Sequence, residues 1–214
     1  MVCRHHDTRG IACSDADCGL CKHNPAKRCR PNEYLSDKYL EQDQLTARCG
    51  AELVLQAYAL DTGETVPMPD TLVGASVELV VINGVVAPDG RLPPTFSFDD
   101  PEQVFVSHSD NQPLLVPGVG ARHNDRSGVV LDLQEGEGQS LPRIAITKSS
   151  ESLLSGRKAM FRLVARVVGN EEVVPAVSVA FVVRVCVCAV VWVFLCVSCC
   201  VLLLCGCCCV AFAD

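Results

Sequence analysis

The sequence predicts a mainly β protein built as an antiparallel β-sandwich, and three observations support this fold class. Short apolar runs rich in Val, Leu and Ile follow one another from residue 49 to residue 183. Gly, Pro, Asn and Asp residues separate these runs at the spacing of tight turns. No stretch in this region carries a convincing helical period. Short strands joined by such turns are typical of two packed antiparallel sheets.

The clearest strand is expected at residues 161–168, FRLVARVV. Apolar residues alternate there with Arg162, Val164 and Arg166, and they are Phe161, Leu163, Ala165 and Val167. A period of two directs the apolar set to a core and both arginines to the opposite face. We therefore expect a half-buried strand whose outer face carries positive charge.

Seven further strands are expected in the same region. They are 52–60, 76–82, 104–107, 114–116, 128–133, 143–147 and 177–183. Asn83-Gly84 is a strong turn signal, and residues 61–64 and 135–138 are also expected as turns. A Pro- and Asp-rich loop is expected from 87 to 101, and a polar turn at Ser149-Ser150.

The first 30 residues hold few large apolar side chains but several soft metal ligands. Cys18-x2-Cys21 is a pair that can grip one tetrahedral ion from a single turn, and Cys3-x2-His6 is a second such pair. The expected ligand set is Cys3, His6, Cys13, Cys18, Cys21 and Cys29. A structural Zn²⁺ would replace the missing core, because its binding energy becomes folding energy. The alternative is a reduced, disordered Cys-rich segment.

Residues 31–48 are expected as a polar linker to a domain that spans residues 49–184. Four apolar or aromatic residues in it are candidates for pinning the linker to the domain, namely Tyr34, Leu35, Tyr39 and Leu40.

Charge restricts where a nucleic acid can bind. The chain has a net charge of −7, and residues 45–168 hold ten Lys and Arg against fifteen Asp and Glu. Any nucleic-acid contact therefore requires a local basic patch. The expected patch is Arg157, Lys158, Arg162 and Arg166. The alternative is that Arg162 and Arg166 pair with acidic neighbours across the sheet and serve solubility.

Six segments carry a resemblance to a known family. They are ALDTGETV (59–66), VELVVINGVV (77–86), QPLLVPG (112–118), SGVVLDL (127–133), SGRKAMFRLVARVV (155–168) and AVSVAFVV (176–183). In order and spacing this series resembles the plant calmodulin-binding transcription-regulator family over about residues 50–183. The resemblance implies an Ig-like fold and sequence-directed DNA binding in the nucleus.

The chain departs from that family in three respects. The Cys-rich N-terminus is extra, and the family's Asn-Ser-Ser-Trp turn appears as Lys148-Ser149-Ser150-Glu151. The family's C-terminal calmodulin-binding segment is also absent, which argues against calmodulin as a partner.

Residues 185–213 are apolar almost throughout and contain nine of the fifteen cysteines. The stretch is long enough to span a bilayer as a helix. Three explanations remain open: a C-terminal tail anchor, a metal-binding tail, or translated non-coding sequence in a faulty gene model. The alternating Val-Cys start, of the kind that GT repeats encode, favours the last.

No sequence motif of a known enzyme class is present, so the expected protein is not an enzyme. The leading hypothesis is a nuclear, DNA-binding transcription regulator with an accessory zinc module. The alternative is a tail-anchored membrane protein whose cytosolic β-sandwich binds a protein partner.

Overall fold

The computed structural model describes residues 2–3, 34–87, 91–100, 102–105, 112–123, 128–136, 138–141, 143–154 and 160–185. These residues form a mainly β fold with antiparallel sheets, which confirms the predicted class at that level. The helical segments of the described ranges are two single turns, the 3-10 helix η2 (Asp70–Leu72) and the α-helix α1 (Ser150–Leu153).

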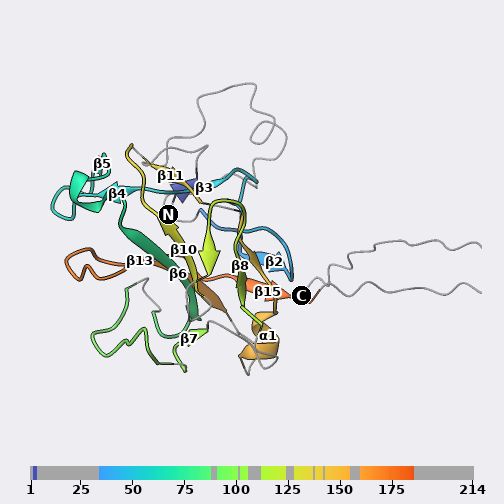
Figure 1. The fold of residues 1–214 in the computed structure, drawn as a ribbon. Coiled ribbons are helices and arrows are strands. Elements are labelled where there is room, and N and C mark those ends of the chain that lie inside the picture. The colour runs from blue at the N-terminus through green and yellow to red at the C-terminus, as the bar shows by residue number, and fades with distance from the viewer. Residues whose placement is uncertain are drawn as a thin grey trace, which may run out of the picture.

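The largest sheet has six strands and is organised around β6 (Ser76–Asn83). Its strand order is β14 (Ala176–Val177), β13 (Phe161–Val167), β6, β10 (Val129–Asp132) and β9 (Arg122–His123), while β7 (Val104–Phe105) also pairs with β6 (Figure 1). The β6–β13 pair runs from Asn83 opposite Phe161 to Val77 opposite Val167. The expected strands at 76–82 and 161–168 are therefore confirmed almost to their ends.

Smaller sheets complete the domain. Three antiparallel groups join β1 (Val2–Cys3), β3 (Leu53–Leu55) and β11 (Gln139–Ser140), then β8 (Leu115–Val116) and β12 (Ala145–Ile146), then β4 (Ala57–Tyr58) and β5 (Thr65–Val66). A fourth group is a parallel pair that joins β2 (Lys38–Leu40) to β15 (Val182–Arg184).

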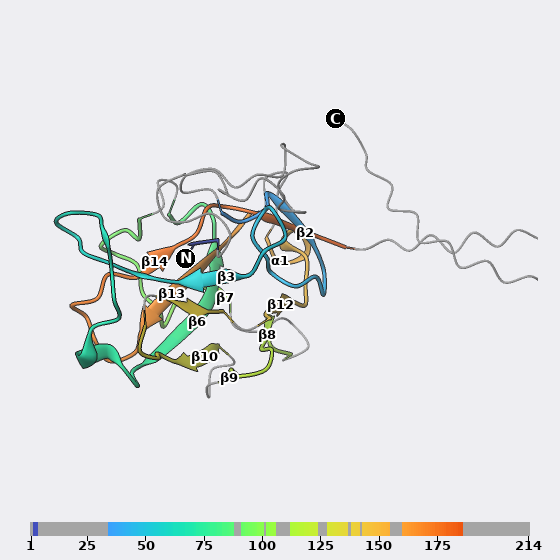
Figure 2. The same cartoon turned by 90° about the horizontal axis from the view of Figure 1, so that it is seen from above.

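The main core packs one face of the six-stranded sheet against these smaller sheets, as Figure 2 shows from above. Phe161 and Phe181 are fully buried there, with ring centroids 6.4 Å apart. Tyr39 meets Phe181 edge to face at 5.5 Å. Edge-to-face packing is one of the arrangements that aromatic rings prefer, so side chains as well as backbone hold β2 to the segment that enters β15.

Residues 34–48 belong to this fold instead of linking to it. Tyr34, Leu35 and Tyr39 are buried in the main core, as three of the four proposed pinning residues. The Tyr39 hydroxyl donates to the Thr46 carbonyl, and β2 pairs with the last strand of the domain. A polar segment with a few apolar anchors thus contains a strand that the sequence pattern did not indicate.

Two expected strands are split because the chain changes partner within them. In the 52–60 run, β3 pairs with β1 and β11, whereas β4 pairs with β5 beyond Gln56. In the 177–183 run, β14 pairs with β13 and β15 pairs with β2. Between them the Ser178 hydroxyl accepts from the Leu163 amide at 2.8 Å, which holds the crossing segment to β13.

The expectation of a half-buried β13 is wrong, because both faces of this strand are covered. Its inner residues lie in the main core, as the alternation predicted. Its outer face contributes Val164 to a second cluster with Val80, Ile82, Ala87 and Val104. Phe96 and Phe98, from the loop at 91–100, pack onto that cluster. The loop at 91–100 thus covers the outer face of the six-stranded sheet.

Within the ranges that the structure describes, no helix has both the length and the apolar character needed to cross a bilayer. The apolar stretch at 186–214, for which a spanning helix was one hypothesis, lies outside those ranges.

Candidate functional site

The four residues of the expected basic patch fall into two groups. Arg157 and Lys158 lie outside the described residues, in the segment that connects α1 to β13. Arg162 and Arg166 lie on β13, on the face opposite the main core. That placement agrees with the predicted alternation, but neither guanidinium is presented freely to solvent.

Arg162 is a buried residue with 8% of its surface exposed. Its Nη1 donates to the Ser178 carbonyl at 2.6 Å, and its Nε donates to the Gly84 carbonyl at 3.3 Å. Both acceptors are backbone carbonyls, which a guanidinium fork can reach from a single buried position. Arg162 therefore ties the start of β13 to the turn after β6 and to the segment that crosses between sheets.

Arg166 pairs with Glu78, its direct neighbour across the β6–β13 ladder. Arg166 Nη2 and Nε lie 2.6 Å and 2.7 Å from Glu78 Oε2. Only 4% of the Glu78 side chain and 26% of the Arg166 side chain are exposed. The Arg166 guanidinium also stacks on the Phe98 ring, with 4.0 Å from Cζ to the ring centroid, which is cation–π geometry.

The alternative raised from the sequence, pairing with an acidic cross-strand neighbour, therefore describes Arg166. Arg162 is not the exposed cation that the basic-patch expectation requires, because it is buried on the sheet. One signal in the sequence did point to the pair: Glu78 stands in the middle of the apolar run SVELVVI, where a buried acid needs a cation.

A second ion pair lies on the edge of the same sheet and is exposed. Arg122 of β9 donates to both carboxylate oxygens of Asp132 in β10, at 2.8 Å and 3.0 Å. The Ser76 hydroxyl donates to Asp132 Oδ1 at 2.9 Å. The hydrogen bond from Arg122, followed by the one from Ser76, lowers the pKa of Asp132 below its ordinary value, and Asp132 raises the pKa of Arg122.

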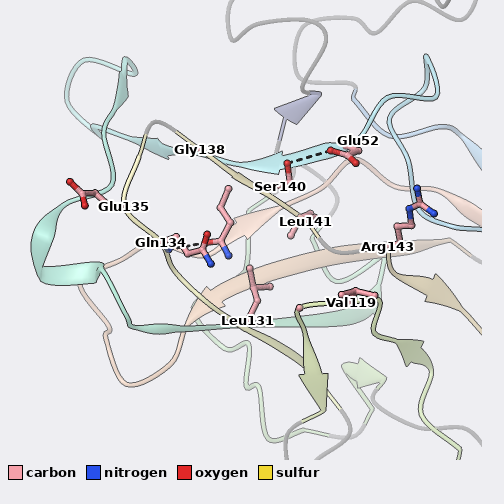
Figure 3. A pocket seen from close by; sticks show the side chains of 11 residues that line it. Glu52, Val119, Leu131, Gln134, Glu135, Gly138, Ser140, Leu141 and Arg143 are labelled. Atoms are coloured by element: carbon pink, nitrogen blue, oxygen red, sulfur yellow. Dashed lines mark hydrogen bonds between the residues drawn. The ribbon is translucent and has the colours of Figure 1, made fainter.

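A cavity of about 640 Å³ opens between the β3–β11 pair and the end of β10 (Figure 3). Charged and amide side chains dominate its lining, and the polar members are Glu52, Gln134, Glu135, Gln139, Ser140 and Arg143. The Ser140 hydroxyl donates to Glu52 Oε2 at 3.4 Å. Gln139 closes the turn between β10 and β11, donating to the Asp132 carbonyl at 2.9 Å and accepting from the Gln134 amide at 3.1 Å.

Among the described residues that line the cavity there is no histidine or cysteine. The lining residues come from four separated segments, which left no local pattern in the sequence to predict the cavity.

The expected zinc ligands lie almost wholly outside the described part of the chain. Cys3 is placed in β1, while His6, Cys13, Cys18, Cys21 and Cys29 fall in the ranges that are not described. Elsewhere, within the described ranges, no group of three or more His, Cys, Asp or Glu is arranged to hold a metal ion.

Comparison of the chain with models of protein families, with curated proteins and with solved structures finds no match.

Proposed function

We propose that this chain is a non-enzymatic, DNA-binding transcription regulator of the nucleus, built on an Ig-like β-sandwich. Two things support the proposal: the ordered series of segments that resembles the plant regulators, and the basic sequence Gly156-Arg157-Lys158 directly before β13. In this proposal residues 1–30 form the accessory zinc module.

The observation that carries the site assignment is the environment of Arg162 and Arg166. Arg162 is buried and donates to two backbone carbonyls, and Arg166 is ion-paired with Glu78, so neither guanidinium is presented to a phosphate. In this proposal Arg157 and Lys158 contact the DNA. Arg162 and Arg166 are positioning residues that hold β13, the strand that follows Arg157 and Lys158 in the sequence. In DNA-binding proteins, contacts to phosphates and groove edges are commonly made by residues that a rigid scaffold positions.

The test measures DNA affinity across a salt series, using the full chain and a random duplex pool. Arg157→Ala with Lys158→Ala should weaken binding and reduce the salt slope by about two, since each lost phosphate contact removes about 0.9. The matched control, Arg122→Ala with Arg143→Ala, also removes two exposed cations but lies elsewhere on the surface. Equal loss in both double variants, or no binding by the unaltered chain at low salt, would overturn the proposal.

A second candidate function follows from the composition of residues 185–213. If this stretch is made in the cell, its length and apolar character support a tail anchor, and the domain would face the cytosol and bind a protein partner. Long-read cDNA across the Arg184 codon separates the two candidates. We expect the dominant transcript to diverge there, and a major form that carries the codons for 185–214 would favour the anchored protein.

A further inference from the structure

One end of the domain gathers three connections from two distant parts of the sequence, residues 57–72 and 168–175. The β4–β5 hairpin, η2 and the loop from β13 to β14 lie together at the left of Figure 1 and again at the left of Figure 2. A groove of about 100 Å³ runs between them, and its lining includes Ala57, Leu72, Val173 and Val174. The remaining lining residues are mostly apolar; most belong to β3, β6, β13 and β14, and Gln56, Met68 and Leu133 lie between strands.

The connections that flank this groove carry exposed apolar side chains. They are Leu60, Val174, Val168, Val73 and Tyr58, with 78%, 60%, 49%, 43% and 37% of their surfaces exposed, and Val174 also lines the groove. We call these five residues, with the groove, the hairpin-end patch. Single exposed apolar residues are ordinary on a protein surface, but several of them on neighbouring connections beside a groove favour an interaction site.

The charge around the hairpin-end patch has one sign. Residues 56–75 and 167–176, which form the three connections, contain no Lys or Arg. The same segments contain five carboxylates, Asp61, Glu64, Asp70, Glu171 and Glu172, all of them exposed. The one cation in the lining, Arg166, is paired with Glu78. The patch is therefore apolar at its centre and acidic at its edge.

We propose that the hairpin-end patch docks a basic, apolar peptide segment of a partner protein, such as the apolar face of a Lys- and Arg-rich amphipathic helix. Charge complementarity selects this occupant. DNA and anionic lipid surfaces are repelled by the acidic rim. A second copy of the chain would bring one acidic rim against another, which disfavours a symmetric dimer through this face.

The docking site is separate from the proposed DNA contact. The patch adjoins Val167 at the end of β13, whereas Arg157 and Lys158 precede Phe161 at its start. Six residues of extended strand separate these ends by about 20 Å. The two proposed contacts therefore involve different residues, and they can be tested independently.

The probe is a short fluorescent helical peptide of Leu and Lys, compared with a peptide in which Glu replaces every Lys. Fluorescence anisotropy with the full chain should show binding of the Leu/Lys peptide that weakens with salt, and no binding of the Leu/Glu peptide. Leu60→Ser with Val174→Ser should weaken binding about tenfold or more, because two apolar anchors are lost. Glu171→Gln with Glu172→Gln should reduce the dependence on salt.

The matched control is Val85→Ser with Val119→Ser, two valines that are 70% and 101% exposed and lie outside the patch. This control should bind the peptide like the unaltered chain. Equal weakening in the control, binding of both peptides alike, or self-association of the chain that Leu60→Ser with Val174→Ser abolishes would each overturn the proposal. DNA affinity measured on the same patch variant should be unchanged, which keeps failure of this site distinct from failure of the DNA-binding proposal.

Discussion

Removing Arg166 should destabilise the domain strongly, because the Glu78 carboxylate beneath it is almost wholly buried. The two side chains meet at 2.6 Å, and 4% of Glu78 is exposed. Taking away one partner of a buried ion pair costs about 3–5 kcal/mol, and the partial exposure of Arg166 places the expected loss near the lower value, about 3 kcal/mol. The change from Arg166 to Met keeps most of the apolar stem and isolates the loss of charge.

The assay is thermal unfolding of the full chain under reducing conditions, supported by urea titration. A loss of about 3 kcal/mol should lower Tm by roughly 6–12 °C for a domain of this size. Glu78→Leu with Arg166→Met should recover most of the lost stability, because replacing both partners removes the unpaired carboxylate from the second cluster. The cluster around Val80, Val164 and Phe98 is already apolar and suits that replacement.

Arg122→Met provides the matched control. Its partner Asp132 lies at 2.8 Å, yet the two side chains are 59% and 50% exposed. Exposed pairs contribute little, so its Tm should stay close to that of the unaltered chain. The reasoning fails if Arg166→Met melts like Arg122→Met, or if the double variant is no more stable than Arg166→Met alone.

Three further predictions follow from single features. Gly84→Ala should lower the free energy of unfolding in urea by about 1–3 kcal/mol. The added Cβ would lie 2.8 Å from the Met160 carbonyl oxygen, a backbone atom with little room to move. Stability equal to that of the unaltered chain would contradict this prediction. Because the pKa of Asp132 is lowered in the folded chain, its ionised carboxylate stabilises the fold at pH values above the ordinary carboxyl pKa of 3.8. This contribution is lost as the pH falls through the folded-state pKa. The stability gap between the unaltered chain and Asp132→Asn should therefore narrow between neutral pH and pH of about 3, and a constant gap would argue against the Arg122 and Ser76 contacts. Metal analysis of the purified full chain should find about one Zn²⁺ per chain that Cys18→Ser with Cys21→Ser removes, and a metal-free chain whose circular dichroism ignores chelator would exclude the zinc module.

Local sequence pattern was sufficient for the strands that pair along their whole length. The alternation in Phe161–Val167 and the apolar run in Ser76–Asn83 gave the two central strands and the inner face of β13. The turn signal at Asn83-Gly84 was also correct, since the Val86 amide donates to the Asn83 carbonyl at 3.0 Å. In each of these cases the residues that decide the structure are neighbours in the chain.

Long-range covering of the sheet was not predictable in the same way. The outer face of β13 becomes buried because Phe96 and Phe98 fold back from a Pro- and Asp-rich loop, more than sixty residues earlier in the chain. That covering changes Arg166 from an exposed charge into a half-buried partner of the buried Glu78. Two phenylalanines inside an otherwise polar loop were the available hint, because large aromatic residues rarely remain in solvent without a reason.

The parallel β2–β15 pair has a mechanical consequence for whatever is attached to the two ends of the domain. The incoming chain reaches the pair at Lys38, opposite Val182, and the outgoing chain leaves it at Arg184, opposite Leu40. These points are at opposite ends of the pair, so tension applied between the flanking segments slides the strands along each other. The bonds from the Glu41 amide to the Arg184 carbonyl and from the Val182 amide to the Asp37 carbonyl, each 2.9 Å, then bear load together instead of opening one by one. The short parallel β2–β15 pair, whose two strands lie far apart in the sequence, therefore resists stretching of the domain.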